Sequence, residues 1–84
     1  MKCNDIEFLR KQLDKLGYER KPLNDCIQHV HSDGTIVNTY HNEKEKEKTV
    51  TFQGKVTEEK KDGITQMISA INTITDIVDT ANKS

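Results

Sequence analysis

The sequence predicts an α+β domain in which a helix, three strands and a second helix follow one another. Apolar residues recur at helical spacing over residues 4–16 and 58–81, whereas apolar and polar residues alternate over parts of residues 26–56. Between two of the alternating segments, Asp33-Gly34 is a strong signal for a hairpin turn. The simplest packing of these elements is a three-stranded antiparallel meander with both helices on one face of the sheet.

The first helix is predicted over residues 4–16, where one face carries Ile6, Leu9, Leu13 and Leu16. We expect Asn4 to be its N-cap, with Glu7 three residues later completing a capping box. Gly17 is expected at the left-handed position that ends the helix. Residues 19–24 are expected to form a connector, because Pro22 excludes a continuing helix.

The strands are predicted over residues 26–31, 35–41 and 49–56. A two-residue turn at Asp33-Gly34 places Val30 opposite Val37 and Cys26 opposite His41. In this register, the face that carries Cys26, Val30 and Val37 is the expected core, and the face that carries His29 and His31 is the wetter one. Within the last strand, Gly54 predicts a bulge or a close approach by the covering helix.

The second helix is predicted over residues 58–81, with Thr57 as its N-cap. Its apolar arc covers roughly half of the circumference, which is broader than the arc of an ordinary surface helix. Two interpretations remain open: the arc packs entirely within its own chain, or part of it forms the seam of a homodimer. The expected seam residues are Ile71, Ile74, Ile77 and Val78.

The length limits the chain to one domain over residues 1–84. Its charge composition argues against an extended binding surface of a single charge sign. The 13 basic and 14 acidic residues are evenly spread, so no segment supplies the field that non-specific binding to nucleic acid or membranes uses. Weak nucleic-acid binding is therefore only the second alternative, through Arg10, Lys11, Lys15, Arg20 and Lys21. Without an apolar leader or a membrane-length apolar run, we expect a cytoplasmic protein whose two cysteines are reduced.

One cluster has the residue types of a metal site, namely Cys26, His29, His31 and His41. Strand geometry argues against it, because His29 and His31 project to one face of the predicted sheet and the other two to the opposite face. Cys26 and His41 also have the residue types of a nucleophile and its base, but no oxyanion donors are visible near them. We therefore predict no catalytic, metal-binding or cofactor-binding residue and do not expect an enzyme.

The leading hypothesis is a small non-enzymatic protein-binding module that occupies a surface of a larger protein partner. A protein of this small size would fit an accessory or inhibitor protein of a phage or mobile element. The expected partner-binding residues lie on the wetter face or at the charged loop before the third strand, and are Ile27, His29, His31, Tyr40, Glu43 and Lys44. The first alternative is a homodimer that holds a nucleotide or another small anionic metabolite at its seam.

Overall fold

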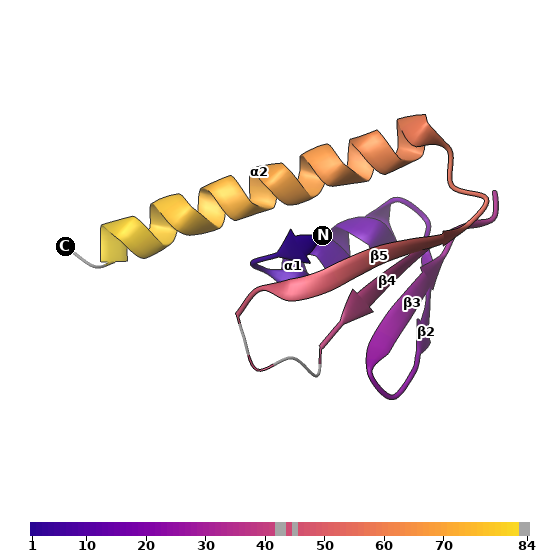
Figure 1. Cartoon of the computed structure of the whole chain (residues 1–84), viewed down its shortest axis with the longest axis horizontal. Coiled ribbons are helices and arrows are strands. Elements are labelled where there is room, and N and C mark those ends of the chain that lie inside the picture. The colour runs from indigo at the N-terminus through magenta and orange to yellow at the C-terminus, as the bar shows by residue number, and fades with distance from the viewer. Residues whose placement is uncertain (42–43, 45, 83–84) are drawn as a thin grey trace.

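The computed structural model describes residues 1–41, 44 and 46–82. Within them the elements are β1 (Lys2–Cys3), α1 (Ile6–Lys15), β2 (Glu19–Pro22), β3 (Cys26–Val30), β4 (Thr35–Tyr40), β5 (Lys48–Gly54) and α2 (Glu58–Asn82). The strands of this described part form one five-stranded antiparallel sheet in the order β1-β5-β4-β3-β2 (Figure 1). The α+β class is confirmed, and the bounds of the predicted elements agree within two residues.

The prediction of three strands is wrong, because two short edge strands carry no sequence signal. β1 pairs Lys2 with Thr49 on β5, and its two residues are too few to show a period. β2, which was expected to be a connector, pairs along its whole length with residues 27–30 of β3, although all of its residues are exposed and polar or proline. Pro22 is tolerated there because an edge strand needs no backbone donor on its outer side.

The N-terminus of α1 is capped by Asp5 and not by Asn4 as predicted. The Asp5 Oδ1 atom accepts a hydrogen bond of 3.1 Å from the backbone N–H of Phe8. Asn4 lies one residue too early, and its backbone N–H instead donates to Asn72 Oδ1 of α2 at 2.8 Å. At the other end of α1, the left-handed conformation predicted for Gly17 is confirmed by its φ of +93°.

The β3–β4 hairpin has a three-residue turn and not the predicted two-residue turn. The N–H of Gly34 donates to the carbonyl of His31, and the N–H of His31 donates to the carbonyl of Thr35. With a φ of +94°, Gly34 occupies the left-handed position of a turn that includes a bulge. The extra residue shifts the register by one, so Val37 lies opposite His29, and Cys26 lies opposite Tyr40 instead of His41.

This shift reverses the two faces of β3. His29 is fully buried beside Val37 on the face that the helices cover, so the prediction of a wetter His29 face is wrong. Cys26 and Val30 lie on the opposite face of the sheet, which contradicts their expected place in the core beside Val37. Cys26 is nevertheless buried there.

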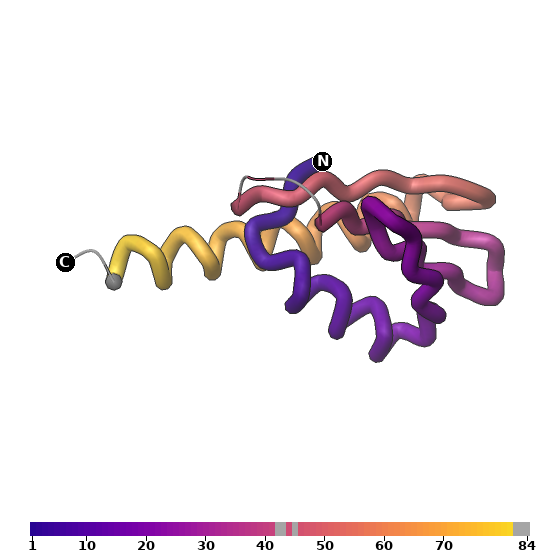
Figure 2. Tube along the Cα trace, turned by 90° about the horizontal axis from the view of Figure 1, so that it is seen from below, coloured from indigo at the N-terminus to yellow at the C-terminus, as the bar shows by residue number. Residues whose placement is uncertain are grey.

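The hydrophobic core lies between one face of the sheet and both helices. It comprises Cys3, Leu9, Leu13, Tyr18, Val37, Val50, Ile64, Ile68 and Ile71. Since α2 has 25 residues, it is about 37 Å long at 1.5 Å per residue, against a longest molecular dimension of 45 Å. Its C-terminal turns consequently project beyond α1 and the sheet (Figures 1 and 2).

Gly54 makes the close approach that was predicted, but with a different partner. A Cβ atom at this residue would lie 2.3 Å from the carbonyl oxygen of Gly34, and its φ is +76°. The constraint therefore comes from the backbone of the β3–β4 turn and not from the covering helix.

Candidate functional surface

The residues predicted to bind a partner do not come together in the structure. Ile27 and His29 lie on the helix-covered face, whereas Tyr40 lies on the opposite face. His31 is in the hairpin turn, and Lys44 is exposed in the β4–β5 connection. Glu43 lies outside the described residues. The predicted face thus depended on a register that the chain does not adopt.

His29 belongs to a buried polar network under α1. Its Nε2 atom lies 2.9 Å from Thr39 Oγ1, which also accepts a 2.8 Å hydrogen bond from Arg10 Nε. Arg10 further donates to Glu7 and to His41 Nδ1. Burial, followed by the charges of Arg20 and Arg10, lowers the pKa of His29 to about 4, so this imidazole is neutral at pH 7. The network supports the fold and is closed to a partner.

The proposed pairing of Cys26 with His41 is not formed. His41 Nδ1 accepts from Arg10 at 3.1 Å, while Cys26 lies opposite Tyr40. Both cysteines are buried free thiols, and burial raises the pKa of Cys3. Among the described residues, no three histidine, cysteine, aspartate or glutamate side chains are grouped as metal ligands would be.

Both arginines of the basic cluster predicted for nucleic acid form ion pairs within the chain. Arg10 is buried, and Arg20 binds the Asp14 carboxylate through two hydrogen bonds of 2.8 and 3.0 Å. This ion pair lowers the pKa of Asp14. Two of the five basic groups are thereby neutralised, which leaves a weak field for phosphates.

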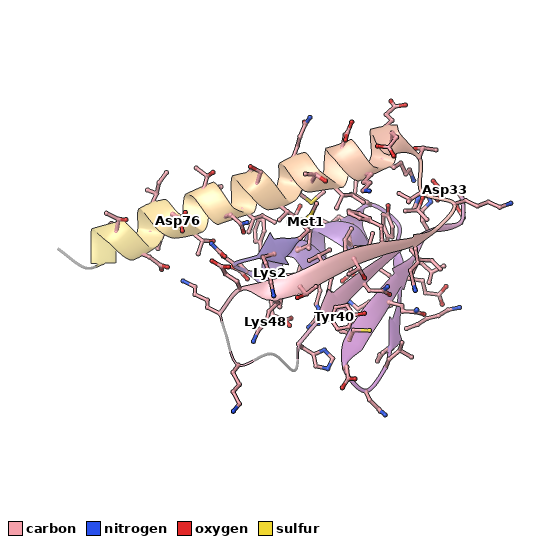
Figure 3. All side chains as sticks on the ribbon, in the orientation of Figure 1. Met1, Lys2, Asp33, Tyr40, Lys48 and Asp76 are labelled. Carbon is pink, nitrogen blue, oxygen red and sulfur yellow. The ribbon has the colours of Figure 1, made fainter. Side chains whose placement is uncertain are left out.

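The most conspicuous surface is an apolar stripe along α2, which we call the α2 stripe. It comprises Gly63, Met67, Ala70, Ile74, Ile77 and Ala81. On its projecting turns, Ile74 is 60% and Ile77 is 65% exposed, and the adjoining Val78 is 51% exposed. Asp76 marks the same projecting turns, far from Tyr40 (Figure 3). Exposed large apolar side chains gathered on one element are typical of interaction sites.

The expected dimer seam is thus divided between two environments. Ile71 is buried in the core of its own chain, whereas Ile74, Ile77 and Val78 are exposed. Two neighbours of this surface were not predicted, namely Phe8 on α1 and Leu16 at the C-terminal cap of α1, which are also about half exposed. For Phe8 the available signal was its place outside the face of Ile6, Leu9 and Leu13, whereas Leu16 shares that face and its spacing gave no sign of exposure.

Two hollows adjoin the α2 stripe. The larger has a volume of about 310 Å³ and is lined by Leu16, Tyr18, His31, Lys60, Gly63, Ile64 and Met67. The smaller, of about 80 Å³, is lined by Asp5, Phe8, Ile71, Ile74 and Thr75. Since the start of α1 meets the later part of α2, and the end of α1 meets the earlier part, the two helices are antiparallel, with one hollow at each end of α1.

Asp33, in the hairpin turn near the start of α2, interacts with two residues that line the larger hollow (Figure 3). Its carboxylate forms an ion pair with Lys60 and lies 3.2 Å from His31 Nδ1. The hydrogen bond from Lys60, followed by that from the Thr35 N–H, lowers the pKa of Asp33. The centres of the Tyr18 and His31 rings lie 4.9 Å apart. Burial raises the pKa of the Tyr18 hydroxyl.

Comparison with protein-family models, with curated proteins and with solved structures gives no match for this chain. Within the described residues, none of the helices has both the length and the apolar character needed to cross a lipid bilayer.

Proposed function

We propose that this chain is a non-enzymatic protein-binding module, and that its binding surface is the α2 stripe with the adjoining residues of α1. The observation that carries the proposal is the exposure of Ile74, Ile77 and Val78 on turns that project beyond the rest of the domain. Burying a fully exposed side chain of this size is favourable by about 1.5–3 kcal/mol, and roughly half of that remains to be gained by each of these half-exposed ones.

The shape of this surface favours a helical partner segment. A third helix can lie along two neighbouring helices and place its apolar side chains in hollows spaced along them. Here the two hollows lie at opposite ends of α1, beside Leu16 and Phe8. The open face of the sheet offers less apolar surface, because its centre is a polar ladder in which Asn38 donates to Thr51 and Gln28 donates to Gln53.

Site-specific photocrosslinking in cells that express the full chain tests this function. A benzophenone amino acid at Ile77 is expected to give a protein adduct, identified by mass spectrometry, whereas the same group at the exposed Gln53 is not. The substitution Ile74→Asp should abolish the adduct, and Ser69→Asp, on the opposite side of the same helix, should leave it intact. Equal labelling from Ile77 and Gln53, or none from either, would remove the basis of the proposal.

A second candidate function is the binding of a small anion with an apolar part in the larger hollow. Its volume of about 310 Å³ is at the lower end of small-molecule sites, and its lining combines apolar side chains with the ammonium group of Lys60. An anion there competes with Asp33 for Lys60. A thermal-shift screen of nucleotides and carboxylic acids tests this function, and Lys60→Gln should abolish any stabilisation.

A further inference from the structure

The α2 stripe has a spacing that matches itself when the helix is reversed. Its members are separated by four, three, four, three and four residues, which is the heptad spacing of helices that pack side by side. The pattern is symmetric about residue 72. Reversing a second α2 about this residue places Ala81 against Gly63, Ile77 against Met67, and Ile74 against Ala70. Two of these three pairs, Ala81 with Gly63 and Ile74 with Ala70, include a small residue, which allows the helices to approach closely.

The residues that flank the stripe do not oppose this pairing. On one side they are Ile64, Ile71 and Val78, and on the other Gln66, Thr73 and Thr80, none of which is charged. The acidic residues of the projecting turns lie elsewhere on the helix, and Asp79 forms an ion pair with Lys46. An antiparallel arrangement also sets the positive end of each helix dipole near the negative end of the other.

We propose that the protein that binds the α2 stripe is a second copy of this chain, in an antiparallel dimer centred on residue 72 of α2. This inference rests on the proposed function. The projecting turns of each copy lie along the earlier part of α2 of the other copy, so that Ile77 packs beside Met67 and Leu16 at the larger hollow. Each copy thus covers the larger hollow of the other, which is the mutual arrangement of a two-fold interface.

The available surface is adequate for such a dimer. Phe8, Leu16, Ile74, Ile77 and Val78 each expose about half of their surface or more. Counted on both copies, they supply apolar area on the order of 1,000 Å², near the lower limit for a specific interface. Over residues 63–81 the paired helices run together for about 27 Å at 1.5 Å per residue. A second copy therefore offers a partner surface for these five side chains.

Light scattering after size exclusion, at several concentrations of the untagged full chain, tests the dimer. We expect twice the 9.6 kDa chain mass for the wild type and for Ser69→Asp, which adds the same charge away from the stripe. Ile77→Asp should halve the mass while leaving the far-UV circular dichroism unchanged. A wild-type monomer at several hundred micromolar, or a dimer that survives Ile77→Asp, would overturn the proposal.

Disulfide trapping tests the orientation. When the M67C and I77C variants are mixed and oxidised, a disulfide between the two different chains is expected. A parallel dimer would instead link I77C chains to one another, and that result would overturn the antiparallel arrangement. The wild type, whose two cysteines are buried, serves as the control.

These outcomes separate the two proposals. If the wild type is a monomer but Ile77 crosslinks to a different protein in cells, the second copy is excluded and the protein-binding function stands. If the wild type is a monomer and no adduct forms, both are overturned.

Discussion

Burial of His29 makes the stability of the fold depend on pH above the range in which carboxylates titrate. Its pKa is about 4 in the folded chain, against 6.5 as the ordinary value expected in the unfolded chain. Below pH 6.5 the unfolded state binds the proton first, so the free energy of unfolding falls as the pH falls. The loss is about 1.4 kcal/mol per pH unit, or about 2 kcal/mol at pH 5, and approaches 3 kcal/mol at pH 4.

The geometry around His29 explains why protonation is costly. In the tautomer with the proton on Nε2, the ring donates to Thr39 Oγ1, and that hydroxyl donates to the carbonyl of Ile27. Nδ1 has no hydrogen-bond partner among the described residues and is buried. A second proton would therefore place a buried, unpaired N–H near the positive charges of Arg10 and Arg20.

Urea denaturation between pH 7 and pH 5, at fixed protein concentration and ionic strength, measures this effect. The wild type should lose about 2 kcal/mol over the interval, whereas His29→Gln should be nearly independent of pH. His41→Gln is the matched histidine control and should keep the slope. The pKa values of Asp14 and Asp33 are lowered in the folded chain, so the stability that these carboxylates provide is lost only below about pH 4, outside the interval. A flat wild-type profile, or an unchanged slope in His29→Gln, would refute the reasoning.

Three further predictions concern stability, each measured by chemical denaturation. Gly54→Ala should lower the free energy of unfolding by about 2–4 kcal/mol, because the new Cβ meets a backbone oxygen and the residue has a positive φ, whereas Gly63→Ala should raise it by about 0.5–1 kcal/mol, because this helical residue faces open space. Equal effects of the two substitutions would contradict the structure. Asp5→Ala should cost about 1 kcal/mol through loss of the N-cap, and Asn4→Ala much less; the reverse order would restore Asn4 as the cap. Asn72→Ala should cost about 1–3 kcal/mol, because it leaves an N–H and a carbonyl of the N-terminal segment without their α2 partner; no change would show that water replaces that partner.

The sequence predicts the α+β class, both helices and three of the strands, because each of these segments is long enough to show a regular spacing of apolar residues. It cannot predict β2, whose exposed polar residues form a strand only because β3 offers a free edge. It also misses the bulge at Gly34, since Asp-Gly serves two-residue and three-residue turns alike. That single residue moves His29 from the expected surface into the core and removes the predicted binding face.

The broad apolar arc of α2 is divided between two sides of the helix. Ile64, Ile68 and Ile71 pack into the core, and the α2 stripe is rotated from them by roughly 100° around the helix axis. Periodicity alone cannot separate these sets, because both recur at helical spacing. What separates them is which side of α2 the sheet and α1 cover, and the later turns of α2 extend beyond both. The same helix therefore completes its own core with one side and, in our proposal, pairs with a second copy through the other.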